Sequence, residues 1–320
     1  MNTCRICLDP NNLVMNSKFE GYHDKCVASF FGSLKTEPVL DLTEAQFYHK
    51  ARSSKGMSIS GVQAKLGVSV IDGRLVTCDE KSEYILKPCP KEFPELPVNE
   101  HLTMRLAKLA GQDVADCGLI KFSDGEYAYI VKRFDRIDDE KIHQEDLMQA
   151  MGKPNAESGS KYETSYEEAA ACISVAEGGG TVEVSKFIFR IMFMYLIGNG
   201  DFHLKNTSIL YPSNEPPKLT PIYDAVNTDI YGDSEFMALS LLYDDETTEE
   251  FDKLGFYSLA DFIELGRRSG VPSKAVEKHA KKLVSTFPKF IEYVTLSYLD
   301  GDSREKYLNL LFDRIRAFDS

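Results

Sequence analysis

The chain has 320 residues, of which 43% are hydrophobic and 27% are charged, as in ordinary folded globular proteins. This length accommodates one large core or two moderate ones. The net charge of -13 argues against nucleic acid as a direct partner, because contacts to phosphates need clustered Lys and Arg.

The sequence also argues against export and against a membrane location. The N-terminus, MNTCRICLDP, lacks the basic and apolar regions of a signal peptide. The most apolar window, residues 187–197, is too short to cross a bilayer and contains Arg190. The 7 cysteines show no spacing typical of disulfides, which fits a reducing compartment. We therefore expect a cytoplasmic protein that has no membrane partner.

The first part of the chain is predicted to be rich in strands. Apolar residues alternate from Leu66 to Val70, and Asp72-Gly73 then supplies a hairpin turn. One helix, opened by Pro97 and ended at Gly111, interrupts the strands. The predicted strands cover residues 66–70, 75–76, 84–87, 118–122 and 127–133.

The second part is predicted to be mainly helical. Helical patterns cover residues 144–151 and 184–197 and recur from residue 254 to the C-terminus, while residues 207–210 and 219–223 read as short strands. We therefore expect a small N-terminal segment with a Cys/His pattern (1–50), a strand-rich part (51–133) and a helical part (134–320).

The strongest chemical signal is the segment Gly198–Asn206, which reads Gly-Asn-Gly-Asp-Phe-His-Leu-Lys-Asn. Asp201 stands five positions before Asn206, and Lys205 lies between them. Phosphoryl transfer needs a carboxylate that orients the attacking hydroxyl, an oxygen ligand for magnesium, and positive charge near the transferred phosphate. This segment offers all three, so it predicts a centre for phosphoryl transfer.

A second carboxylate follows at Asp224, expected at the end of a short strand, where it could bind magnesium through oxygen. The alternative is that Asp201 and Asn206 only cap turns in an ordinary loop. The presence of Asp224 weakens that alternative.

Further residues in the strand-rich part could hold phosphate. Lys87 ends a predicted strand, and Glu100 in the next helix is a candidate partner for it. The small residues of 56–65, including Ser60, Gly61 and Val62, would let backbone N–H groups approach phosphates closely, although a flexible linker explains them as well.

The N-terminal segment contains Cys4-x2-Cys7 followed by His23-x2-Cys26. These residue types and spacings suit a Cys3His zinc site, which would be structural because four protein ligands leave no open position. The alternative is a set of plain reduced cysteines.

Seven short motifs follow one another between Ser58 and Asp224. They are Ser-Ile-Ser-Gly-Val-Gln-Ala-Lys (58–65), Ile-Leu-Lys-Pro (85–88), Asn-Glu-His (99–101), Arg-Phe-Asp-Arg (133–136), His-Gln-Glu-Asp (143–146), the 198–206 segment and Pro-Ile-Tyr-Asp (221–224). In this order they resemble the successive motifs of the HipA-like serine/threonine toxin kinases. The short N-terminus and the Ser-Ile-Ser loop are most similar to the HipT toxins of tripartite HipBST systems. Ala64 departs from the proline usual in the family.

The resemblance implies an α+β, bilobal protein-kinase-like fold of the HipA type, with a β-rich N-lobe and a helical C-lobe. It implies an ATP- and Mg²⁺-dependent toxin kinase that phosphorylates an aminoacyl-tRNA synthetase, the tryptophanyl enzyme in HipT-like members, and so inhibits translation. The implied partners are this substrate, a HipB-like DNA-binding antitoxin and a HipS-like small antitoxin.

The resemblance also assigns roles to residues. Asp201 would be the catalytic base, while Asn206 and Asp224 would bind magnesium. Lys205 joins Asp201 as a predicted catalytic residue because it supplies positive charge near the transferred phosphate. The implied nucleotide contacts are Lys87, Ser60, Gly61, Val62, Lys132, Phe134, Asp135 and His203, and the implied autophosphorylation sites are Ser58 and Ser60.

Two other readings of the sequence remain open. The same centre could serve a small-molecule or lipid kinase, although the sequence shows no basic patch that would face a membrane. A catalytically silent binding partner is the other alternative. The presence of Asp201, Asn206 and Asp224 argues against it.

Overall fold

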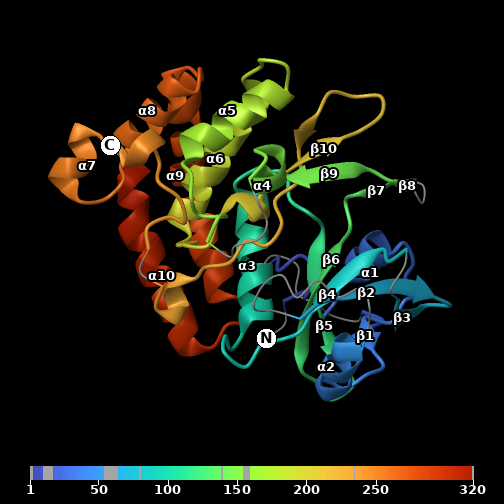
Figure 1. Ribbon diagram of the computed structural model, residues 1–320. Helices are drawn as coiled ribbons and strands as arrows, with labels where there is room; N and C mark the ends of the chain where they lie inside the picture. Colours follow the sequence, from blue (N-terminus) through green and yellow to red (C-terminus); the bar gives the residue numbers. More distant parts are fainter. Residues whose placement is uncertain are drawn as a thin grey trace. The chain divides into compact units, whose positions relative to one another are not determined.

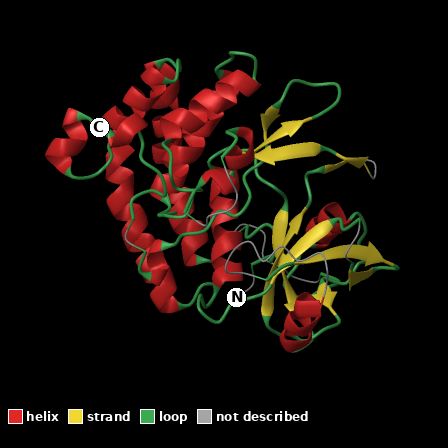
Figure 2. Ribbon diagram, viewed as in Figure 1, coloured by secondary structure: helices red, strands yellow, loops and turns green. Residues whose placement is uncertain are grey.

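The computed structural model of the chain describes residues 3–9, 17–53, 64–78, 81–137, 140–153, 159–233 and 235–318. It is a mixed α and β structure that divides into two compact units (Figures 1 and 2). The first unit holds residues 1–106, 115–139 and 292–304, and the second holds residues 107–114, 140–291 and 305–320.

The first unit is built around a small closed barrel (Figure 1). Its strands follow the order β1-β3-β2-β4-β6-β5, and β1 closes the barrel by pairing in parallel with both β3 and β5. The unit contains α1 (Asp24–Phe31), β1 (Val39–Leu40), α2 (Glu44–Ser53), β2 (Leu66–Ile71), β3 (Arg74–Thr77), β4 (Tyr84–Lys87), most of α3 (Leu96–Leu109), β5 (Cys117–Phe122), β6 (Tyr127–Lys132) and β7 (Arg136–Ile137).

Local sequence accounts for most of these strands. Asp72 and Gly73 both have positive φ, so they form the tight turn that the β2–β3 hairpin requires. Alternate residues of β2 and β4 point into the barrel, where Val68 and Leu86 are fully buried. The strands predicted before and after residues 72–73, at residues 84–87 and around residues 118–133 are therefore confirmed.

The N-terminal residues pack into the same core. Cys4, Ile6, Tyr22 and Val27 are buried together with side chains of the barrel strands. The Tyr22 hydroxyl donates to the carbonyl of Leu119 in β5 at 2.9 Å. The segment before residue 50 thus contributes to the barrel core through side-chain packing as well as through β1.

The second unit is mainly helical, as predicted (Figure 2). It contains β8 (Glu140–Lys141), β9 (His143–Asp146), α4 (Leu147–Ala150), α5 (Tyr166–Ala176), α6 (Val182–Leu196), β10 (Ser208–Tyr211), β11 (Lys218–Leu219), α7 (Glu249–Leu254), α8 (Leu259–Arg268) and most of α9 (Ser273–Thr295) and α10 (Gly301–Arg314). Four short 3-10 turns lie at residues 204–206, 229–231, 243–245 and 315–318.

Helix α6 is the centre of the second unit. It is buried along most of its length, as its apolar sequence predicts. Its one arginine, Arg190, is only 4% exposed and donates to the carbonyl of Thr220 at 2.8 Å. Burial lowers the pKa of Arg190 to about 10. The helix therefore anchors the loop that precedes Asp224.

Two local predictions are wrong. Residues 144–151 do not form one helix, because His143–Asp146 pair with β10 as strand β9 and only Leu147–Ala150 are helical. Asp146 caps that short helix by accepting from the backbone N–H of Gln149. Asp224 does not end a strand: β11 stops at Leu219, and only an isolated bridge between Ile222 and Val114 precedes Asp224.

Within the described ranges, no helix combines the length and the apolar character needed to span a membrane.

The first prediction concerns the packing of α2 on the barrel. Phe47 is fully buried and its ring lies 5.6 Å from that of Phe122 in β5. Phe47→Ala should destabilise the first unit by about 3–5 kcal/mol, because it leaves a cavity the size of a phenyl ring. Urea unfolding measures this, with Phe312→Ala as the control, since Phe312 is 48% exposed. Equal losses in both variants would contradict the described packing.

The second prediction concerns pH. His101 in α3 is 1% exposed, its Nε2 lies 3.1 Å from the carbonyl of Ile6, and burial lowers its pKa from 6.5 to about 4. Below pH 6.5 the imidazole of His101 binds a proton in the unfolded chain, whereas in the folded chain the buried imidazole stays neutral until the pH is lower. Stability should therefore fall between pH 6.5 and 4 by up to about 3 kcal/mol, given about 1.4 kcal/mol per pKa unit.

Urea unfolding at a series of pH values measures this loss. His101→Gln keeps an N–H donor but does not titrate, so its stability should depend less steeply on pH in this range. A variant with the same pH dependence as the wild type would rule out His101 as the cause.

Candidate functional site

Both units contain side chains that were predicted to carry chemistry. In the first unit, Lys87 at the end of β4 forms an ion pair with Glu100 in α3, with 2.8 Å between Nζ and Oε1. The side chain of Glu100 is 1% exposed and that of Lys87 is 12% exposed. Because the pair is largely shielded from water, the ammonium is held in one place. The contact expected between Lys87 and Glu100 is therefore present.

The predicted nucleotide residues around Asp135 form a second ion cluster in the first unit. Arg133 binds the Asp135 carboxylate with two nitrogens, at 2.7 and 2.9 Å, and Arg136 adds a contact at 3.0 Å. Burial alone would raise the pKa of Asp135, but the two arginines keep it below its ordinary value. Lys132 is exposed and Phe134 is half-buried. The Asp135 carboxylate thus serves to hold the chain that leaves β6.

In the second unit, the segment Gly198–Asn206 forms a tight loop directly after α6. Gly198 has φ of +67°, and the N–H of Asn199 returns to the carbonyl of Met194 at 3.0 Å, which ends the helix. Thr228 then fixes the loop, because its hydroxyl accepts from the N–H of Gly200 at 2.8 Å and donates to the carbonyl of Gly198 at 3.1 Å. The glycines at both positions suit this close packing.

The loop brings its two predicted chemical groups together. The side-chain nitrogen of Asn206 donates to the backbone carbonyl of Asp201 at 2.8 Å. Asn206 is 8% exposed, whereas half of the Asp201 side chain (51%) is exposed. This bond fixes the orientation of the Asn206 amide and leaves its oxygen as the atom available to a cation.

Three neighbours surround the Asp201 carboxylate. The hydroxyl of Tyr162 donates to Oδ1 at 2.6 Å, while Nε2 of His203 lies 3.7 Å and Nζ of Lys161 lies 3.9 Å from the same oxygen. Burial and the bond to Asp201 raise the pKa of Tyr162, so the phenol stays protonated and donates. Burial lowers the pKa of His203 despite the nearby carboxylate, so its ring is neutral at pH 7.

Asp224 lies close to this group in an unusual backbone conformation. Its φ is +59°, a region that non-glycine residues rarely adopt and that is enriched at functional sites. The preceding Tyr223 is held by its hydroxyl, which bonds Ser208 at 2.6 Å and the carbonyl of Lys205 at 2.9 Å. Asp224 acts electrostatically on His203, and its side chain is exposed.

The structure thus brings Asp201, His203, Asn206 and Asp224 into one region of the second unit. Lys205 is half-buried in the same loop. Asn206 and Asp224 offer amide and carboxylate oxygens, the ligands that Mg²⁺ prefers, so the donor set fits that ion. Ser58, Ser60, Gly61 and Val62 lie outside the described residues. Cys4, Cys7, His23 and Cys26 form a separate cluster in the first unit.

Sequence reasoning missed three residues of the site. Tyr162 and Lys161 contact Asp201, and Thr228 holds the loop of residues 198–206 in place. Tyr162 and Thr228 stand about 40 and 30 positions from their partners, so no local pattern could reveal the contacts. A tyrosine or threonine alone carries no chemical signature in a sequence.

Comparison with known proteins shows the family. Residues 57–291 match the HipA-like C-terminal domain. A candidate kinase of Haemophilus influenzae is 36% identical over 296 residues, which cover 86% of this chain and 85% of that protein. The serine/threonine-protein kinase toxin HipA of Shewanella oneidensis is 30% identical over 267 residues, covering 75% of this chain and 58% of the toxin.

Solved structures agree on the fold. HipA of Shewanella oneidensis, in complex with HipB and operator DNA, has a TM-score of 0.64 at 24% identity and matches 83% of this chain and 66% of its own. The proinflammatory kinase CtkA of Helicobacter pylori has a TM-score of 0.53 at 13% identity, covering 80% of this chain and 91% of that one. The chain therefore belongs to the HipA-like kinase family, although it spans just over half the length of the Shewanella toxin.

The geometry of the loop generates the third prediction. A Cβ at Gly198 would meet the side chain of Leu310 and come within 3.2 Å of Asp229, at a φ that disfavours every residue with a Cβ. Gly198→Ala should therefore destabilise the protein by about 1–3 kcal/mol, measured by thermal or urea unfolding.

Gly301→Ala is the matched control, because a Cβ there meets nothing within 4 Å. This change should leave stability unchanged or raise it slightly. If Gly198→Ala behaves like Gly301→Ala, the described conformation at Gly198 is wrong.

Proposed function

We propose that the chain is an ATP- and Mg²⁺-dependent serine/threonine protein kinase with a bilobal kinase-like fold. The observation that carries the proposal is the bond from the Asn206 amide to the Asp201 carbonyl. It joins a half-exposed carboxylate and an amide oxygen in one rigid loop. A carboxylate that can accept a hydroxyl proton, next to an oxygen ligand for magnesium, is the arrangement that phosphoryl transfer needs.

The proposed roles follow the positions of the side chains. Asp201 orients a serine hydroxyl and accepts its proton while the hydroxyl oxygen bonds to the γ-phosphorus and the bond to ADP breaks. Asn206 and Asp224 hold Mg²⁺, which when bound neutralises charge on the phosphates. Lys205 adds positive charge in the same loop. His203, neutral and buried, lines the site beside Asp201.

The nucleotide contacts are proposed from the first unit. Lys87, held by Glu100, binds phosphate as a fixed positive charge. Lys132, Phe134 and Asp135 contribute to the adenine and ribose region, where the carboxylate of Asp135 acts by holding the chain through its arginines. Ser60, Gly61 and Val62 contribute to a phosphate loop, and Ser58 and Ser60 are the proposed autophosphorylation sites.

The biological role is proposed from the relatives. The Shewanella protein is named as a toxin and was crystallised with HipB and operator DNA. By analogy with that protein, this chain is a toxin restrained by a HipB-like DNA-binding antitoxin. The resemblance of its motifs to HipT toxins adds the proposals that it is cytoplasmic, of the HipT type, and also bound by a HipS-like small antitoxin. Its proposed substrate is an aminoacyl-tRNA synthetase, and the tryptophanyl enzyme is the first candidate. The chain itself contacts neither nucleic acid nor membrane, in keeping with its net charge of -13.

The fourth prediction is the test of this proposal. With magnesium and γ-labelled ATP, the wild-type chain should label a purified synthetase, and Asp201→Ala should be about a hundredfold slower or worse, because it loses the base and positioning group. Asp313→Ala is the matched control, since Asp313 is 73% exposed on α10, and should label at the wild-type rate.

Each result has a distinct meaning. If only the chain itself is labelled, the kinase proposal stands but the synthetase is not its substrate. Labelling only of small molecules or lipids in an extract would favour a small-molecule or lipid kinase. If no phosphate is transferred even after phosphatase treatment, and Asp201→Ala folds normally, the chain is a catalytically silent binding partner.

A further inference from the structure

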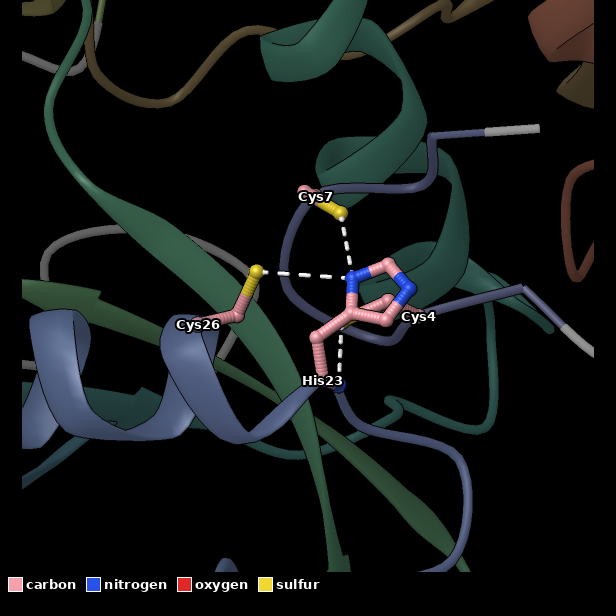
Figure 3. A group of neighbouring side chains, drawn as sticks. All are labelled: Cys4, Cys7, His23 and Cys26. Carbon is pink, nitrogen blue, oxygen red and sulfur yellow. Dashed lines mark hydrogen bonds between the residues drawn. The ribbon is translucent and has the colours of Figure 1, made fainter. Parts of the chain in front are cut away.

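The first unit contains a second group of chemical side chains that phosphoryl transfer does not use. Cys4 and Cys7 lie in the N-terminal loop, His23 immediately precedes α1, and Cys26 lies in its first turn (Figure 3). Their three sulfurs and one ring nitrogen all lie within 4.8 Å of one another. Among the described residues, this is the one such group of three or more histidine, cysteine or acidic side chains.

The distances fit a tetrahedral metal site. Zinc binds sulfur at about 2.3 Å and histidine nitrogen at about 2.0–2.1 Å, so tetrahedral angles put a ligand sulfur about 3.5 Å from a ligand nitrogen. Nδ1 of His23 lies 3.3 Å from Sγ of Cys7 and 3.6 Å from Sγ of Cys26. The side chains converge on one point from two separate segments (Figure 3).

Backbone groups support a thiolate at Cys4. Its Sγ accepts from the N–H of Ile6 at 3.5 Å and from the N–H of His23 at 3.3 Å, although the side chain is fully buried. Amide donors of this kind stabilise negative charge on a metal-bound sulfur and orient the ligand. A ligand set of three thiolates and one imidazole excludes magnesium and calcium, which take oxygen, and favours zinc.

We propose that Cys4, Cys7, His23 and Cys26 bind one zinc ion in a closed structural site. Four protein ligands leave no position for water or substrate, so the ion acts on stability and not on catalysis. This proposal does not depend on the kinase activity.

The zinc site would hold the N-terminal loop in place, and this loop contacts other elements of the first unit. Between the first two ligands, the carbonyl of Arg5 accepts from the N–H of Leu119 in β5 at 2.8 Å. The carbonyl of Ile6 lies 3.1 Å from Nε2 of His101 in α3, next to Glu100. The ion would thus join the N-terminal loop to α1. The same loop contacts both β5 and α3, and α3 carries the Glu100 that pairs with Lys87.

The fifth prediction is the metal content of the purified full chain. Elemental analysis and native mass spectrometry should find one zinc ion per chain after purification without a metal column. Cys26→Ser should lose most of this zinc. Cys172→Ser should retain it, because Cys172 is a half-buried free cysteine outside the cluster. Cobalt(II) in place of zinc should give the intense visible absorption of a tetrahedral thiolate site.

A second measurement on the wild type keeps the proposal testable if Cys26→Ser does not fold. Removing the metal with a strong chelator should lower the unfolding temperature and speed amide hydrogen exchange in residues 4–7 and around His101. Zinc should restore both properties and magnesium should not. A folded wild-type chain without zinc, a chain that holds iron instead, or equal zinc in Cys26→Ser would each overturn the proposal.

Discussion

The ion pair between Lys87 and Glu100 is the constraint on which the arrangement of the first unit depends. Neither charge can remain buried without the other, and removing one partner of such a pair costs about 3–5 kcal/mol. The pair therefore fixes α3 against the end of β4. The same helix carries buried His101, which ties it to the N-terminal loop, so one helix links the barrel, the loop and the lysine proposed to hold phosphate.

The parts of the fold that could be predicted are those decided by neighbouring residues. The β2–β3 hairpin follows from Asp72-Gly73, whose backbone fits the turn. The closure of the barrel by β1 could not be predicted, because a two-residue strand pairs with Lys121 and Phe122 some 80 positions away. Strand β9 was mistaken for helix for the same reason, since its partner is β10. Helix α5 was missed although Ser165 and Glu168 form a recognisable capping box.

In the candidate site, too, contacts within one short segment could be predicted and contacts between distant segments could not. Asp201 and Asn206 lie five positions apart, so their contact follows from one loop and could be predicted. The strained backbone at Asp224 could not be predicted, because a positive φ at an aspartate depends on how Tyr223 is anchored to Ser208 and Lys205. The four zinc-type ligands could be predicted as residue types and spacings. Their convergence depends on the N-terminal loop packing against α1, which only the structure shows.

The hydrogen bond from Tyr162 to Asp201 affects whether a protein hydroxyl or a water molecule can reach the carboxylate. The phenol of Tyr162 occupies Oδ1, the kind of atom to which an acceptor hydroxyl would donate. An incoming serine can replace it with little net cost, because one O–H donor is exchanged for another and the rest of the peptide contributes binding. A lone water molecule has no such additional binding and competes poorly. In an Asp201-dependent kinase, Tyr162 would therefore limit the wasteful hydrolysis of ATP between encounters with substrate.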